Sequence, residues 1–138
     1  MNGIVYHPNG YFLVDNSNTG RIYKVDAKNP GNVTQVMIDQ YFLGADGLLL
    51  NDNNRLTIVV NGGTDKIFQL TSEDNWQTAK LAATTIAADR FTYPATATFA
   101  DNSIWVMNAK TNELMDSNAI PAKWFAIQKV VLKPVPKK

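Results

Sequence analysis

Short runs of β-forming residues alternate with clusters of turn-forming residues along almost the whole chain, and we expect these runs to be strands. In the first third, the expected strands are Gly3–Tyr6, Tyr11–Asp15, Arg21–Asp26 and Val33–Ile38. The segments between them, such as His7-Pro8-Asn9-Gly10, are rich in residues that accept turn geometry. Apolar residues often occupy both faces of a run, which fits strands covered on both sides.

The same pattern continues through the rest of the chain. The strands expected there are Leu48–Leu50, Arg55–Val60, Lys66–Thr71, Ala79–Ile86, Ala95–Phe99, Ser103–Met107 and Trp124–Leu132. Ala79–Ile86 also has residues that favour a helix, but Thr84-Thr85-Ile86 and its place as a fourth strand favour a strand. The two prolines within residues 133–138 predict a flexible tail, since proline cannot donate to a strand ladder.

A short motif occurs three times and divides the chain into units. Its form is Asn-x-x-Thr-x-charged-aliphatic, and it stands at Asn16–Ile22, Asn61–Ile67 and Asn108–Leu114, with spacings of 45 and 47 residues. A period of this size, built from short strands, is typical of four-stranded propeller blades. We therefore predict an all-β half-propeller over residues 1–132, with three four-stranded β-propeller blades at about 1–42, 43–90 and 91–132.

Three blades are too few to close a ring, because propellers have typically four to eight. An open arc leaves the faces of its two terminal blades bare, and exposed apolar faces mark association sites. The sequence therefore predicts that the ring is completed in one of two ways. Either two copies join as a homodimer in a six-bladed ring, or a missing half-propeller belongs to a longer chain.

Composition narrows the chemistry that the chain can perform. The 138 residues suffice for one domain, and 13 Lys+Arg against 12 Asp+Glu leave a net charge of +1, so no nucleic acid partner is expected. No apolar run is long enough for a membrane span, and Met1-Asn2-Gly3-Ile4 has no leader pattern, which predicts a cytoplasmic protein without a membrane partner. Without Cys and with one His, any chemistry rests on carboxylates, amides and hydroxyls.

Two polar residues stand at matching places before the first strands of the first two units. Asn2-Gly3 precedes one strand and Asp46-Gly47 precedes the other. The first strand of a blade is the innermost, so Asn2 and Asp46 are expected at the mouth of the central channel. Their oxygens are ligands suited to Ca²⁺, Mg²⁺ or Mn²⁺. The alternative is that Asn-Gly and Asp-Gly are only turn dipeptides.

The order of these motifs resembles the senescence marker protein/gluconolactonase (regucalcin-like) family of six-bladed propeller lactonases. The resembling segments are Asn2-Gly3-Ile4, Gly44-Ala45-Asp46-Gly47-Leu48 and Tyr93-Pro94-Ala95-Thr96-Ala97 followed by Ile104–Ala109. The resemblance covers nearly the whole chain, but only the C-terminal half of a family member.

The resemblance implies that Asn2 and Asp46 bind a divalent metal ion and that Asp46 also serves as the catalytic base. Ca²⁺ is the expected ion, with Zn²⁺, Mn²⁺ or Mg²⁺ as alternatives, and the implied substrate is a small sugar-acid-like lactone. The family's metal-binding Glu comes from a blade that this sequence lacks, and Glu73 and Glu113 lie in outer loops. A homodimer would bring two copies of Asn2 and Asp46 to one channel.

The other polar and aromatic residues are assigned structural roles. His7, in a turn, is expected at the surface, and Trp76, Trp105 and Trp124 are expected to pack between blades, with Trp76 also a candidate for stacking on carbohydrate. The function predicted from the sequence is a metal-dependent lactonase that is competent only in a complete ring. The alternative is a non-catalytic propeller module for binding or assembly.

Overall fold

The computed structural model describes residues 1–136, which form twelve strands in three antiparallel sheets and two short 3₁₀ helices. The first sheet is a meander in sequence order. Its strands are β1 (Ile4–His7), β2 (Tyr11–Asn16), β3 (Arg21–Asp26) and β4 (Val33–Gln35). Every strand expected in this part of the chain is present, with its ends shifted by up to three residues.

The second sheet repeats the meander. It contains β5 (Ala45–Asp52), β6 (Arg55–Val60), β7 (Lys66–Thr71) and β8 (Lys80–Thr84). The expectation that residues 79–86 form a strand and not a helix is confirmed by β8. A short 3₁₀ helix, η1 (Ala87–Asp89), follows β8 and leads to the third sheet.

The third sheet has three strands where four were expected. Its strands are β9 (Pro94–Ala100), β10 (Ser103–Asn108) and β11 (Ala126–Lys129), and a long connection containing η2 (Thr111–Met115) separates the last two. After β11 the chain crosses to the second sheet, where β12 (Lys133–Pro134) pairs with β8.

The pairing of β12 corrects the expectation of a flexible tail. Lys133 lies opposite Thr84, Pro134 lies opposite Ala83, and the Val135 N–H donates to the Ala82 carbonyl. The proline is tolerated because β12 is an edge strand, where one face of the backbone needs no partner. Residues 137 and 138 of the expected tail lie outside the described residues.

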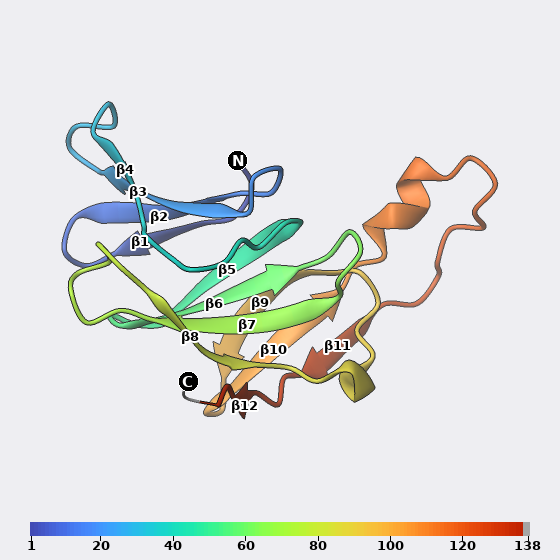
Figure 1. Cartoon of the computed structure of the whole chain (residues 1–138). Helices are drawn as coiled ribbons and strands as arrows, with labels where there is room; N and C mark the ends of the chain where they lie inside the picture. The colour runs from blue at the N-terminus through green and yellow to red at the C-terminus, as the bar shows by residue number, and fades with distance from the viewer. Residues whose placement is uncertain (137–138) are drawn as a thin grey trace.

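The three sheets follow one another with their first strands side by side, the arrangement of successive propeller blades (Figure 1). β5 lies between β1 and β9 and contacts both. One apolar core lies between the first and second sheets, and another lies between the second and third. The prediction of an all-β fold built from three sheets is confirmed.

Burial along the strands follows from this order. Five consecutive residues of β6, Leu56 to Val60, are buried, because both faces of the second sheet are covered. In β1, by contrast, Val5 faces the core while Ile4 and Tyr6 are exposed. None of the described residues belongs to a helix long and apolar enough to cross a membrane.

Two glycines allow the first strands to approach closely. A Cβ on Gly3 would stand 2.5 Å from the main-chain oxygen of Asp46, and a Cβ on Gly47 would stand 2.5 Å from the main-chain oxygen of Ala95. Contacts this short cannot be relieved by rotating a side chain, because the opposing atoms belong to the backbone. Gly3 and Gly47 are therefore required where the strands converge, and Asp46-Gly47 lies within β5 instead of in a turn.

We expect Gly47→Ala to lower the free energy of unfolding by about 1–3 kcal/mol, the usual cost of forcing an extra carbon into a packed interior. Chemical denaturation of the native chain and the variant measures this difference. Gly31→Ala is the matched control, because its added carbon would meet nothing closer than a flexible side chain at 3.5 Å. Equal stability of Gly47→Ala and the control would contradict the role assigned to Gly47.

Candidate functional site

The starts of β1 and β5 lie together and bring the two residues expected from the sequence into one neighbourhood. The Asn2 N–H donates to the Asp15 carbonyl at 3.2 Å, and the Asp15 N–H donates to the Gly3 carbonyl at 3.1 Å. Gly3 in turn lies against the main chain of Asp46. The structure therefore places Asn2, just before β1, near Asp46 in β5, and the main chain of Asp15 is hydrogen-bonded to the Asn2-Gly3 segment.

Asp15 has the most unusual environment among the described residues. It is 0% exposed, and neither carboxylate oxygen has a hydrogen-bond partner. Its Oδ2 lies 2.6 Å from the position that a Cβ on Gly3 would occupy. A buried carboxylate without a partner is costly, because it has lost its water and gained no donor in exchange.

Burial raises the pKa of Asp15 to about 6, and the nearby charge of Asp46 acts in the same direction. The polar backbone of Gly3 and Asn2 and the positive chain terminus act in the opposite direction and offset part of the shift. The carboxyl of Asp15 therefore titrates close to neutral pH, while it stays shielded from solvent.

Asp46 is half-buried and is held by one amide side chain. The Asn61 Nδ2 donates to Asp46 Oδ2 at 2.6 Å and to the Pro94 carbonyl at 2.8 Å. Because Asn61 is itself buried, this pair of hydrogen bonds links the second sheet to the third and fixes the orientation of the Asp46 carboxylate. Asn61 was expected only as part of the repeated motif, and this positioning contact is new.

Asn2 is exposed at the start of the chain segment that leads into β1. Asp15, which is not part of the repeated motif, is a further oxygen-bearing side chain near Gly3. A signal for it was present, because Tyr11, Leu13 and Asp15 alternate along β2 and the first two face the core. A carboxylate in that series is an anomaly that strand periodicity alone can detect.

Asn2, Asp15 and Asp46 each carry hard oxygen atoms in their side chains. No three His, Asp or Glu side chains among residues 1–136 cluster tightly enough to form a metal site by themselves. The unpartnered oxygens of Asp15 nevertheless fit a divalent cation, which would supply the missing positive charge. Glu73 and Glu113 lie elsewhere: Glu73 follows β7, and Glu113 accepts a hydrogen bond from the Ala122 N–H in the β10–β11 connection.

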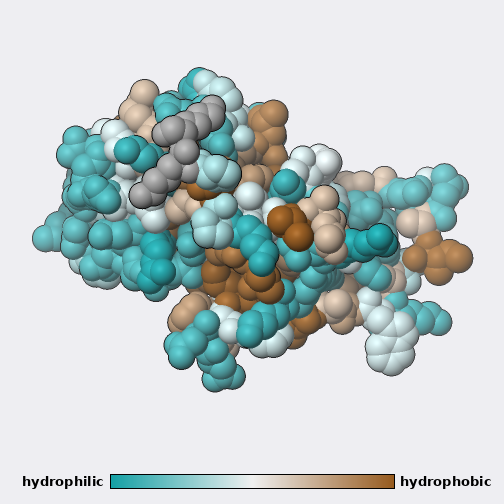
Figure 2. Space-filling model, turned by 60° about the horizontal axis from the view of Figure 1, so that its bottom comes forward, coloured by the Kyte–Doolittle hydropathy of each residue, from teal (hydrophilic) through white to brown (hydrophobic). Residues whose placement is uncertain are grey.

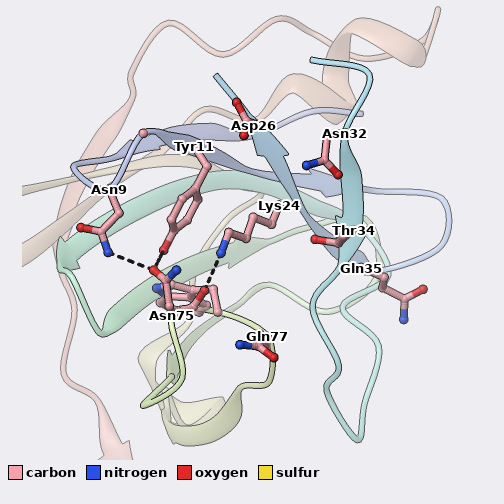
Figure 3. A pocket seen from close by; sticks show the side chains of 11 residues that line it. Asn9, Tyr11, Lys24, Asp26, Asn32, Thr34, Gln35, Asn75 and Gln77 are labelled. Carbon is pink, nitrogen blue, oxygen red and sulfur yellow. Dashed lines mark hydrogen bonds between the residues drawn. The ribbon is translucent and has the colours of Figure 1, made fainter. Parts of the chain in front are cut away.

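A polar pocket of about 590 Å³ lies at the end of the first sheet away from Asn2, between β3 and β4 and the loop after β7 (Figure 3). Its polar groups largely satisfy one another. The Asn75 Oδ1 accepts hydrogen bonds from the Tyr11 hydroxyl at 2.8 Å and from Asn9 Nδ2 at 2.9 Å, and Lys24 Nζ donates to the Asn75 carbonyl at 2.8 Å. These contacts tie the first two sheets together, so we assign the pocket a structural role.

The prediction that His7 is a surface residue is wrong. His7 is 1% exposed, stacks on the Tyr11 ring at 4.4 Å, and bonds through Nε2 to the Asn53 carbonyl at 2.9 Å. Nδ1 accepts from the Asn9 N–H, which makes Nε2 the protonated nitrogen. The hairpin of the second sheet covers this turn, and His7 is therefore a buried structural residue.

The three tryptophans differ in their environments. Trp76 is buried in the first core and donates from Nε1 to the Asn53 carbonyl, so its packing role is confirmed and it offers no face to a sugar. Trp105 is half-buried. Trp124 is 85% exposed, which contradicts the expected packing role, because it lies in the long β10–β11 connection instead of in a strand.

No family model matches the sequence, and no curated protein matches it. Among solved structures the chain is similar to one titled "Streptogramin B lyase structure", with 13% sequence identity and a TM-score of 0.43. The match covers 99% of this chain and 54% of the other, so the chain spans about half the length of that neighbour. The resemblance to the gluconolactonase family stays a prediction from the motifs.

We expect Asp15→Asn to be more stable than the native chain at pH 7 when both are measured in a chelator. The raised pKa means that the folded chain binds the proton more tightly than the unfolded chain. The stabilising contribution of the protonated Asp15 is therefore complete below about pH 4 and is lost as the pH rises to about 6. The loss is at most about 3 kcal/mol.

Denaturation of both proteins at several pH values gives the difference in unfolding free energy, which should grow between pH 4 and 7. The exposed Asp101, in the β9–β10 turn, provides the control Asp101→Asn, for which we expect a constant difference. A constant difference for Asp15→Asn as well would show that the carboxyl is not held in an uncompensated environment.

Proposed function

We propose that this chain is a divalent-cation-dependent hydrolase of the lactonase type, with Asn2, Asp15 and Asp46 at its site. The observation that supports this most strongly is the buried, unpartnered carboxylate of Asp15 beside the strand that carries Asp46. The finer assignment, to a gluconolactonase-like enzyme acting on a small sugar-acid-like lactone, comes from the motif resemblance.

The donor set supports a hard cation as cofactor. Ca²⁺ accepts carboxylate and amide oxygens in flexible geometry, and Mg²⁺, Mn²⁺ and Zn²⁺ also accept carboxylates, so all four ions are candidates. A cation would also stabilise the site electrostatically, because two carboxylates near each other are mutually repulsive unless a positive charge lies between them.

A cation at this site would polarise a lactone carbonyl and lower the pKa of a water molecule. The chain's own residues would do the rest. Asp46 accepts the proton of the attacking water, and the Asn61 amide keeps that carboxylate oriented. Asp15, being buried, contributes charge, while the exposed Asn2 side chain contacts ligand from the solvent side.

The alternative is a non-catalytic module for binding or assembly. It is favoured by the openness of the site in one chain, where Asn2 is exposed and Asp46 is only half-buried. Lactone turnover and cation uptake distinguish the two functions, since a module could retain uptake but would show no turnover.

We expect Asp46→Asn to reduce cation uptake and lactone hydrolysis by at least tenfold, because it removes both a charged ligand and the base. Calorimetric titration with Ca²⁺, Mn²⁺, Zn²⁺ and Mg²⁺ measures uptake, and a pH-stat assay with several lactones measures turnover. Asp101→Asn, at the opposite end of the third sheet, is the matched control and should leave both quantities unchanged. Uptake that is equal in Asp46→Asn and the native chain would refute the site.

A further inference from the structure

The two terminal sheets each have one face that no sheet of this chain covers. We call the uncovered face of the first sheet its leading face. Strand pairing places ten side chains on it: the polar Asn16, Arg21 and Gln35 at the ends of β2, β3 and β4, and, over the rest, the seven residues Ile4, Tyr6, Phe12, Val14, Tyr23, Val25 and Val33. All seven are aliphatic or aromatic, and Ile4 and Tyr6 are 58% and 55% exposed. Val5, which points the other way, packs on the first core.

The corresponding face of the second sheet shows what such a face does. Two cross-strand pairs of the first sheet have equivalents in the second. The pair Ile4–Val14 corresponds to Leu48–Ile58, and the pair Tyr6–Phe12 corresponds to Leu50–Leu56. Across the next pair of strands, Tyr23 and Val25 correspond to Phe68 and Leu70. All six residues of the second sheet belong to the core against the first sheet. A leading face is therefore a surface that docks on the sheet before it.

The free face of the third sheet, which we call its trailing face, has a different character. It carries Thr96, Thr98, Trp105, Met107, Ile127 and Lys129. Ile127 is 73% exposed, whereas Ile104 and Val106 on the opposite side are buried in the second core. Figure 2, which brings the underside of Figure 1 forward, shows hydrophobic side chains exposed among polar ones.

Mixed polarity is normal for a trailing face in this protein. On the trailing face of the first sheet, the apolar Leu13 pairs with the charged Lys24 across β2 and β3. On the trailing face of the second sheet, the apolar Val59 lies beside the polar pair Thr57 and Gln69. Each internal interface thus joins a leading face that is mainly apolar to a more mixed trailing face; the leading face of the third sheet carries Ile104 and Val106 together with the hydrogen-bonded Asn108 and Gln128. The two faces left free are one of each kind, so they are complementary to each other.

We infer that two copies of this chain associate head to tail, each leading face on the partner's trailing face, to close a ring of six sheets. Heterologous contacts of this kind close into a ring when the rotation allows it. Propellers have four to eight blades, and six is the multiple of three in that range, which sets the number of copies at two. An apolar sheet face of this extent is otherwise unusual on a free chain.

The β10–β11 connection provides a second apolar surface for the partner. It projects from the sheets in Figure 1 and exposes five large apolar side chains: Leu114, Met115, Ile120, Trp124 and Phe125. It leaves β10 after Asn108, at the end of the third sheet where β9 begins. This is the same end as Asn2 and Asp46, because β1, β5 and β9 start there.

Closure of the ring would complete the candidate site. The inner strands β1, β5 and β9 line the axis of the arrangement, so the partner subunit would bring a second set of the same oxygen ligands to the channel. This association depends on the sheet faces and not on the cation or the reaction, so its failure is separable from that of the proposed function.

Light scattering after size-exclusion chromatography tests the association directly, in a chelator and without substrate. We expect a mass twice the 15.3 kDa of one chain. Tyr6→Lys on the leading face and Ile127→Glu on the trailing face should each give monomers, because each change buries a charge at both interfaces of the ring. Both side chains are exposed in one chain, so folding should be retained, and circular dichroism verifies it.

Mixing the two variants provides the most specific test. In a mixed dimer one interface contains only native faces, and the other places the introduced lysine of one copy near the introduced glutamate of its partner, so dimers should reappear. Asn54→Lys, at an exposed side chain in the β5–β6 turn of the internal second sheet, is the control and should remain dimeric. A monomeric native chain, or a dimer that Ile127→Glu leaves intact, would overturn the proposal.

Discussion

The structure depends on the close convergence of β1, β5 and β9 at one end of the sheets. A sheet with two apolar faces is stable only when both are covered, and here the covering elements are the neighbouring sheets. Gly3 and Gly47 allow the backbones to approach to distances that any side chain would prevent. The two Gly residues thus determine how closely the sheets pack, and packing between sheets supplies both apolar cores.

The same convergence creates the electrostatic feature of the molecule. Asp15 lies at the end of β2 on the face that packs against the second sheet, so its carboxylate is excluded from water by the contact that stabilises the fold. The corresponding pairing position in the second sheet holds Val59, which is an ordinary core residue. An acidic side chain therefore occupies a position where packing alone favours an aliphatic one. Such positions, which lower the stability of the fold, are typical of functional sites.

The sequence predicted the strands well because each run of β-forming residues is bounded by Gly, Asn, Asp or Pro. It also predicted that Asn2 and Asp46 stand directly before two neighbouring first strands; in the structure Asn2 precedes β1, whereas Asp46 lies within β5. Asp15 was not predicted, because it does not recur in the other two units and the repeat therefore gives no sign of it. His7 was misplaced because burial of its turn depends on Asn53, which is 46 residues away in the sequence. β12 was missed because its pairing with β8 is a long-range contact that no local pattern encodes.

The position of β12 also bears on how the sheets are assembled. The third sheet lacks a fourth strand because the chain that follows β11 pairs with β8, on the outer edge of the second sheet. This crossing ties the last two sheets together at their outer edge, while Asn61 ties them at the inner end through Asp46 and Pro94. The second and third sheets are therefore joined at both ends, and the first and second are joined by hydrogen bonds of the buried side chains of His7 and Tyr11. A unit held this firmly can present its two terminal faces in a fixed relation, which any closed ring built from copies of it requires.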